Sequence, residues 1–295
     1  MATSDELRGL FVALRELGWH ALDIRDILCA AAGFKVSRVA ANSGRVKVLR
    51  PLLEACGVSV VLSDTKFVSA SSCTKGVWSN RLSEISADCP RGSWHLFLAT
   101  DGRMAEEARI RQKLHDHEGL GELLGIPPCC RRFYRNSIAQ AAGHDLLPLV
   151  YQNSVSNRQF DFWTNYAVRY FGYCLLGFAP CSFCCDRAAN IAKGVWSLLS
   201  MLSPETAEIF LSYHRRSVLY SERWGVFLLD IWGRSKDRRE FRTIEMTVDS
   251  SPLVGYMKAG DNIRIDRAEN VYIYRQERLL TTLNRGTCAL CAFDR

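Results

Sequence analysis

The sequence lacks any long hydrophobic run. Its longest apolar stretches, such as YCLLGFAPC at residues 173–181, are much shorter than the roughly 20 residues that a membrane-spanning helix requires. The first residues, MATSDELRGLF, are acidic and polar, whereas a signal peptide starts with basic residues and continues with apolar ones. We therefore expect a cytoplasmic protein that has no membrane segment.

Several well-defined motifs are missing as well. The chain contains no glycine loop of the kind that cradles phosphate, no nucleophile elbow and no HExxH helix. It also has no internal repeat at solenoid spacing and no low-complexity segment. The sequence therefore offers no signature of a nucleotide-binding enzyme, a serine hydrolase or a zincin.

Charge of one sign is not concentrated anywhere. The net charge is +7, but residues 1–100 carry 12 basic and 9 acidic groups, residues 101–200 carry 11 and 9, and residues 201–295 carry 15 and 13. A nucleic-acid-binding surface gathers its basic groups on one face or stripe. Three short helices at the start of the chain resemble a helix-turn-helix reader, but any packed α/β layer has the same pattern. We therefore expect no nucleic-acid partner.

The periodicity of apolar residues predicts an α+β protein in three parts. Within residues 1–115 the spacing of the apolar residues is first helical and then strand-like, which predicts an N-terminal α/β lobe. Thr3 and Glu6 have the spacing of a capping box at its first helix. Residues 116–215 are mainly helical, with a long aromatic helix expected over 160–178 and another over 181–202. Residues 216–295 are rich in strand patterns.

Cysteine is abundant, with twelve in 295 residues, and two clusters stand directly behind a proline. In a reducing compartment, closely spaced cysteines are better interpreted as metal ligands or redox groups than as a disulfide framework. GIPPCCRRFY contains Cys129 and Cys130, and GFAPCSFCCDRAA contains Cys181, Cys184 and Cys185. Proline is tolerated in the first helical turn, where free N–H groups and the helix dipole favour a thiolate. We therefore predict that both clusters lie at helix starts that meet at one site.

The two clusters predict at least three soft metal ligands. One of Cys129 and Cys130 would join Cys181 and one of Cys184 and Cys185, because adjacent cysteines on a helix point in different directions. Three thiolates leave one coordination position open, as in a catalytic metal site. The expected cofactor is an iron–sulfur cluster, with zinc as the alternative. The remaining alternatives are plain packing of small thiols and a metal-free thiol enzyme.

The tail contains a separate CxxC pair, Cys288 and Cys291. Such a pair is typical of half a zinc site or of a redox dithiol. If the tail folds back, it completes a four-cysteine site with the central clusters. We therefore include both cysteines among the predicted metal ligands.

The two cysteine motifs support a resemblance. LGIPPCCRRFY followed by GFAPCSFCCDRA resembles the paired LGxPxCC and PCSxxC motifs of a little-characterised prokaryotic family of unknown function, over about residues 118–195. The resemblance selects Cys181 and Cys185 from the second cluster and leaves Cys184 as a departure from the pattern. It implies no particular activity.

Basic groups surround the predicted site, since residues 126–193 hold 7 basic and 3 acidic side chains. Arginine suits the bidentate capture of a carboxylate or phosphate. The sequence therefore predicts a metal-dependent enzyme that acts on a small anion, such as an amino acid or carboxylic acid, bound by Arg132, Arg187 and His144. The rival hypothesis is a non-catalytic, zinc-stabilised binding protein, possibly one for nucleic acid.

Overall fold

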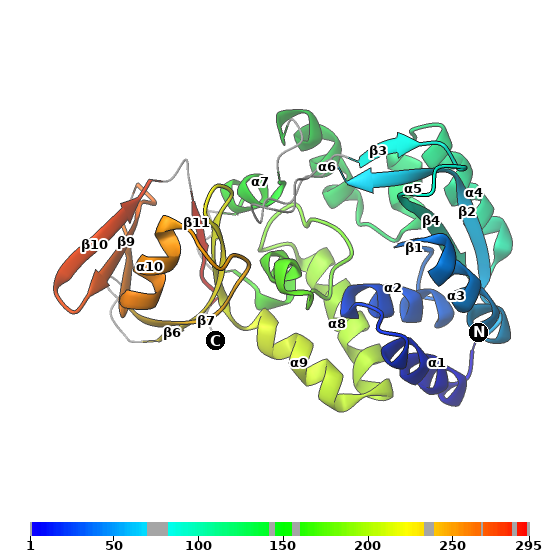
Figure 1. Cartoon of the computed structure of the whole chain (residues 1–295), viewed down its shortest axis with the longest axis horizontal. Coiled ribbons are helices and arrows are strands. Elements are labelled where there is room, and N and C mark those ends of the chain that lie inside the picture. Colours follow the sequence, from blue (N-terminus) through cyan, green and yellow to red (C-terminus); the bar gives the residue numbers. More distant parts are fainter. Residues whose placement is uncertain are drawn as a thin grey trace.

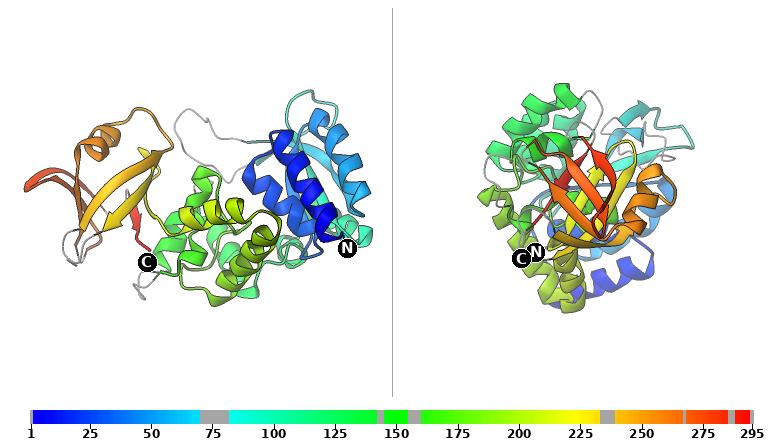
Figure 2. Two further views of the ribbon diagram at one scale, coloured as in Figure 1. Left: turned by 90° about the horizontal axis from the view of Figure 1, so that it is seen from below. Right: turned by 90° about the vertical axis from the view of Figure 1, so that its left-hand side faces the viewer.

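The computed structural model confirms an α+β fold with a β-rich C-terminal part. It describes most of the chain, in these ranges: 2–69, 82–141, 145–154, 160–232, 239–266, 268–284 and 288–293. A four-stranded sheet with its helices forms one end of the molecule, a seven-stranded sheet forms the other, and helical segments lie between them (Figure 1). The left view of Figure 2 shows the same succession from below, and the right view looks along the long axis with the second sheet in front.

The N-terminal part begins with three helices and one short strand. Thr3 caps α1 (Ser4–Glu16), and the capping box with Glu6 forms as its spacing predicts. The next elements are α2 (Ala21–Ala31), β1 (Ser37–Ala41) and α3 (Ser43–Ala55). The sequence of β1, SRVAA, contains no long apolar run, and the strand was not predicted from the sequence.

The first sheet is antiparallel, with the strand order β1-β4-β2-β3. Its other strands are β2 (Ser59–Ser69), β3 (Leu82–Ile85) and β4 (Ser93–Ala99). Side chains of a strand alternate between its two faces. Accordingly, Leu96 and Leu98 pack with the first three helices, whereas Phe97 packs with α4 (Gly102–Lys113) and α5 (His117–Leu123). The sheet is therefore covered by helices on both faces.

The middle of the chain contains α6 (Pro128–Ala141), α7 (Leu147–Gln152), α8 (Asp186–Leu202) and α9 (Pro204–His214). The prediction of one long helix over residues 160–178 is wrong. Two short 3₁₀ segments, η3 (Phe162–Thr164) and η4 (Tyr166–Phe171), take its place. Asn165 separates them, and its buried side chain donates hydrogen bonds to the carbonyls of His214 and Arg216. Gly172, with φ of 83°, ends the second segment.

The start of the following helix also differs from the prediction. The helix α8 begins at Asp186 rather than near Cys181, and Cys185 is its N-cap residue. Residues 181–185 form a turn, in which the backbone N–H of Cys185 donates to the carbonyl of Ser182. The proline before Cys181 therefore precedes a loop and not a helix.

The C-terminal sheet is antiparallel and has seven strands, in the order β10-β9-β8-β7-β6-β5-β11; the first six along the chain form a meander, and the last returns to pair with β5. The helix α10 (Pro252–Ala259) packs on one face of it. The strands are β5 (Ser217–Ser221), β6 (Gly225–Trp232), β7 (Arg239–Met246), β8 (Asn262–Ile265), β9 (Val271–Arg275), β10 (Arg278–Leu283) and β11 (Ala289–Cys291). Alternate residues of β6 belong to different cores: Phe227 packs with α10, whereas Leu228 packs with the helical middle.

One buried apolar cluster extends through much of the molecule. It contains residues of the first helices, the helical middle and the edge of the second sheet, from Leu7 to Phe293. The division into parts at residues 115 and 215 stays a prediction. In the part of the chain that the structure describes, no helix combines the length and the apolar character needed to cross a bilayer.

Candidate metal centre

Four cysteine sulfurs lie within 4.8 Å of one another: those of Cys129, Cys130, Cys181 and Cys185. The sulfur of Cys129 is 3.7 Å from that of Cys185 and 3.9 Å from that of Cys130, and the Cys130–Cys185 separation is 3.8 Å. Cys130 is fully buried, Cys185 nearly so, and the other two are half-buried. Such a group can hold a metal ion or a cluster.

The helix α6 supplies two of these sulfurs from its first turn. It begins at Pro128, and the N–H of Arg131 closes the first turn on the carbonyl of Pro127. Cys129 and Cys130 thus lie where backbone N–H groups have no partner inside the helix. This half of the predicted arrangement, a proline-started helix that presents cysteines, is present in the structure.

The loop before α8 supplies the other two sulfurs. Cys185 lies at the N-terminus of this helix, so two helix N-termini converge on the sulfur group. The backbone N–H of Cys181 donates to the sulfur of Cys130 at 3.3 Å. Cys181 and Cys185 do not share the helix predicted over residues 181–202, because residues 181–185 form a turn. The turn nevertheless brings both sulfurs to the same point.

Polar side chains, two of them buried, hold this cysteine loop in place. Asn153, just after α7, donates to the carbonyl of Cys181 at 2.6 Å. The hydroxyl of Thr164 donates to the carbonyl of Phe183 at 2.7 Å, and the hydroxyl of Ser154 accepts from the Phe183 N–H at 2.8 Å. Irregular backbone in a protein interior needs such partners, because an unpaired buried amide is costly. The loop that carries the two cysteines is therefore well defined.

Arg25 and His214 hold residues 174–176, the segment that precedes the cysteine loop. The Arg25 guanidinium donates to the carbonyls of Cys174 and Leu176 and is paired with Asp26 at 2.6 Å. His214 accepts a hydrogen bond from the Leu175 N–H through Nε2, at 2.9 Å. Both side chains are buried. Residues 174–176 are thus fixed by side chains that come from α2 and from the end of α9.

The ionisation of the sulfurs is strongly coupled. Hydrogen bonds from the thiols of Cys130 and Cys181 lower the pKa of Cys185 well below its ordinary value. Hydrogen bonding to Cys181 and Cys185, together with desolvation, raises the pKa of Cys130 far above it. The expected lowering at both helix starts therefore holds for Cys185 and not for Cys130, whose proton is held in hydrogen bonds to Cys181 and Cys185. Sulfurs this close also oppose one another's ionisation. A bound cation removes that opposition, and metal binding then releases the thiol protons.

Three predicted cysteine ligands lie outside the four-sulfur group. Cys184 is half-buried in the same loop, and its N–H donates to the hydroxyl of Ser182 at 3.3 Å. Cys288 and Cys291 lie at β11, and they differ by three positions, so they face opposite sides of the strand. Cys288 packs in the α10 core, whereas Cys291 packs in the core that contains the helical middle. The tail pair is thus divided between two cores.

Two of the three predicted anion-binding residues lie on the surface of the protein. Arg132 on α6 and Arg187 on α8 are exposed, and His144 lies outside the described residues. Neither arginine lines the pocket that adjoins Cys130, whereas Arg38, Arg131 and Arg135 do. Their role in binding a ligand stays a prediction.

The sequence did not identify the residues that support the site. Asn153, Thr164 and His214 hold the loops in place, yet none belongs to a recognisable motif. The available signal was the presence of polar residues in otherwise apolar stretches, as in FDFWTNYAV, where Thr164 and Asn165 are completely buried. Buried polar groups almost always have a specific partner. That signal indicates that a hydrogen bond forms, but it does not identify the partner residue.

Comparison with known proteins adds no further assignment to this geometry. No model of a protein family matches the chain, and the searches of curated proteins and of solved structures returned no significant match.

Proposed function

We propose that the four cysteines bind a single zinc ion that stabilises the fold of the helical middle. The observation that carries the proposal is the spacing of the sulfurs, three pairs of which are 3.7, 3.8 and 3.9 Å apart. Zinc–sulfur bonds of about 2.3 Å in a tetrahedron place the sulfurs about 3.8 Å from one another. The spacing in the protein therefore matches one tetrahedral ion.

The same spacing favours zinc over the iron–sulfur cluster expected from the sequence. A cluster inserts several iron and sulfide atoms between its cysteine sulfurs, so those sulfurs lie farther apart than the ligands of a single ion. Here the whole group lies within 4.8 Å. A single tetrahedral iron has the same ligand geometry, and metal analysis distinguishes it from zinc.

The ligand number favours a structural site over a catalytic one. The sequence prediction of an enzyme rested on three thiolates and one open position, whereas the group contains four sulfurs. Four thiolates fill the coordination of tetrahedral zinc, as in structural sites. Such an ion would join the start of α6, the start of α8 and the loop at Cys181. A small anionic substrate would have no open position on it, so we place any such ligand beside the metal and not on it.

Metal analysis of the purified protein tests the proposal. We expect one zinc per chain, a colourless protein and no acid-labile sulfide. Replacing Cys185 with serine should remove most of the zinc, because thiolate is the preferred ligand of such soft sites. Cys184→Ser is the matched control, since this neighbouring thiol lies outside the group. Iron with sulfide in stoichiometric amounts, or full zinc content in Cys185→Ser, would overturn the proposal.

A further inference from the structure

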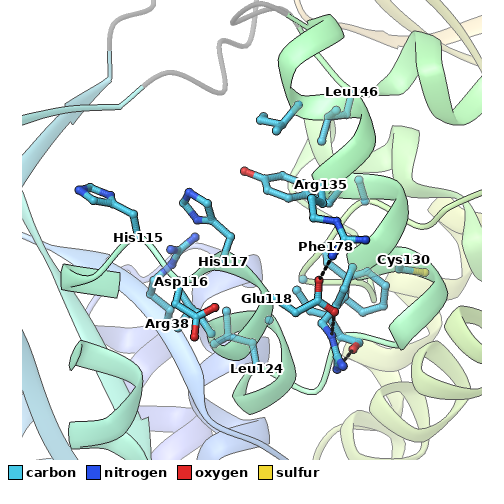
Figure 3. Close-up of a pocket in the computed structure, with 18 of the residues that line it drawn as sticks. Arg38, His115, Asp116, His117, Glu118, Leu124, Cys130, Arg135, Leu146 and Phe178 are labelled. Atoms are coloured by element: carbon cyan, nitrogen blue, oxygen red, sulfur yellow. Dashed lines mark hydrogen bonds and ion pairs between the residues drawn. The ribbon is translucent and has the colours of Figure 1, made fainter. Parts of the chain in front are cut away.

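A pocket of about 600 Å³ adjoins the metal centre, and Cys130 belongs to its wall (Figure 3). The other walls come from β1, the turn between α4 and α5, α5 itself, the middle of α6 and residues 177–179. In Figure 3, the sulfur of Cys130 points away from His115 and His117. The volume is in the range of pockets that enclose a small organic molecule.

Most charged groups in the pocket are already paired. Glu118 is bound by Arg131 at 3.4 Å and by Arg135 at 3.3 Å. Asp116 is bound by Arg111 at 2.7 Å, and it also caps α5. Both carboxylates of the pocket wall are therefore neutralised by neighbouring arginines.

Arg38 is the exception. It projects from β1, and its guanidinium donates to the neutral side-chain oxygen of Gln112 at 3.2 Å. Within the described part of the chain, no carboxylate lies within 4 Å of it to form an ion pair. The side chain is exposed. A guanidinium without a countercharge attracts an anion that enters the pocket, and charge-assisted hydrogen bonds between the two would stabilise the pair.

Further hydrogen-bonding groups stand beside this cation. Tyr134 lies near enough to Arg38 for their charges to interact, and burial raises the pKa of its hydroxyl, which therefore stays a neutral donor. The ring of His117 meets that of Tyr134 edge-on at 6.4 Å, and the ring of His115 is 6.4 Å from that of His117. An anion on Arg38 would thus find further donors within the same wall.

The rest of the wall is apolar. It is formed by aliphatic and aromatic side chains of α5, α6 and the adjoining loops, namely Leu120, Leu124, Ile126, Ile138, Leu146 and Phe178. Such a surface favours a ligand with an apolar body. One unpaired guanidinium matches a single negative charge, and its planar fork fits the two oxygens of a carboxylate.

We propose that this pocket binds a small carboxylic acid with an apolar body, whose carboxylate pairs with Arg38 and whose body packs against Phe178 and the aliphatic wall. The proposal goes beyond the metal centre and does not depend on the identity of the metal. It also assigns the anion to Arg38, on a different element from Arg132 and Arg187.

Binding to the zinc-loaded full chain tests the proposal. Ligand-observed NMR with straight-chain acids of four to ten carbons and with arylalkanoic acids identifies the best probe, and calorimetry measures its affinity. We expect at least one acid to bind, and its uncharged primary amide to bind at least tenfold more weakly. Arg38→Met keeps the alkyl stem and should weaken the acid about tenfold to a hundredfold, the scale of a hydrogen bond to a charged group. Tyr134→Phe should weaken it less.

Two controls keep the result interpretable. Arg132→Met, on an exposed part of α6, should leave affinity unchanged. Zinc content and melting temperature of Arg38→Met should equal those of the wild type, which separates loss of the ligand site from loss of the fold or of the metal. The proposal is overturned if no acid of the panel binds, if the amide binds as tightly as the acid, or if Arg38→Met binds with wild-type affinity. Tighter binding of phenyl phosphate than of every acid would also overturn it, in favour of a phosphate ligand.

Discussion

Phe293, near the end of the chain, packs edge-on against Phe183, with ring centroids 5.3 Å apart and planes at 82°. Phe183 lies between Cys181 and Cys185 and is completely buried. The C-terminal tail thus touches the cysteine loop through an aromatic contact, although its own cysteines are outside the sulfur group. The tail reaches the site by packing and not by ligation.

We therefore predict different effects for the two kinds of change in the tail. Phe293→Ala should lower the free energy of unfolding by about 3 kcal/mol, the scale of removing a buried aromatic ring, and should weaken metal retention. Cys288→Ala and Cys291→Ala should keep one metal per chain. Denaturant unfolding and metal analysis measure both effects. Loss of metal in the cysteine variants alone would show that the tail supplies ligands.

Arg25→Met should destabilise the protein strongly. The substitution removes the donors to the carbonyls of Cys174 and Leu176 and leaves Asp26 with Lys35 at 3.5 Å as its partner. Breaking a buried ion pair in this way costs about 3 to 5 kcal/mol. Chemical denaturation checks the value, and the exposed Arg132→Met should change stability by less than about 0.5 kcal/mol. Equal effects of the two substitutions would contradict the anchoring role of Arg25.

Metal removal should unfold the helical middle partly or fully. Binding energy at a closed site is also folding energy, so a chelator should lower the melting temperature of the wild type by about 10 °C or more, at roughly 2 to 4 °C per kcal/mol. Cys185→Ser, already poor in metal, should melt at the same temperature with and without chelator. A chelator that strips the metal without changing the wild-type melting temperature would refute a stabilising role.

His214 should make stability depend on pH. Desolvation lowers its pKa from 6.5 to about 4 in the folded protein, so the unfolded chain binds more protons between these values. The contribution of His214 to the free energy of unfolding is complete above pH 6.5. It is lost as the pH falls towards 4, by about 1.4 kcal/mol per pH unit. His95 shifts in the same direction, also to about 4. His214→Gln should therefore have a shallower loss of stability over this window than the wild type, as unfolding measured at several pH values would show. If the free energy of unfolding of the two proteins depended on pH in the same way, His214 would not be a source of the pH dependence.

Local signals in the sequence predicted those elements whose stability is local. The Thr3–Glu6 capping box forms as expected, and residues 216–295 are rich in strands as predicted. In contrast, α4 buries only two alanines, Ala105 and Ala108, so its apolar stripe is too weak to predict a helix there. Periodicity reports burial of one face, so it is silent where the buried side chains are small.

The aromatic segment 160–178 shows where local pattern misleads. Its apolar content suits a helix, but the hydrogen bonds from Asn165 to residues 214 and 216 hold the chain in another path. Those partners are about fifty residues away in sequence, and no local propensity accounts for them. Tertiary contacts routinely override propensities that amount to tenths of a kcal/mol per residue.

The sequence by itself predicted that cysteines of two Pro-Cys clusters could hold a metal, because closely spaced cysteines are typical metal ligands. Only the tertiary structure decided which of them meet. Cys181 and Cys185 come together with Cys129 and Cys130 because a turn held by Asn153, Ser154 and Thr164 directs them there. Likewise, only the fold placed Arg38 of β1 opposite Tyr134 of α6, nearly one hundred residues later in the chain. Ligand sets and pockets are made by contacts between segments distant in sequence, and those contacts depend on the packing of the whole core.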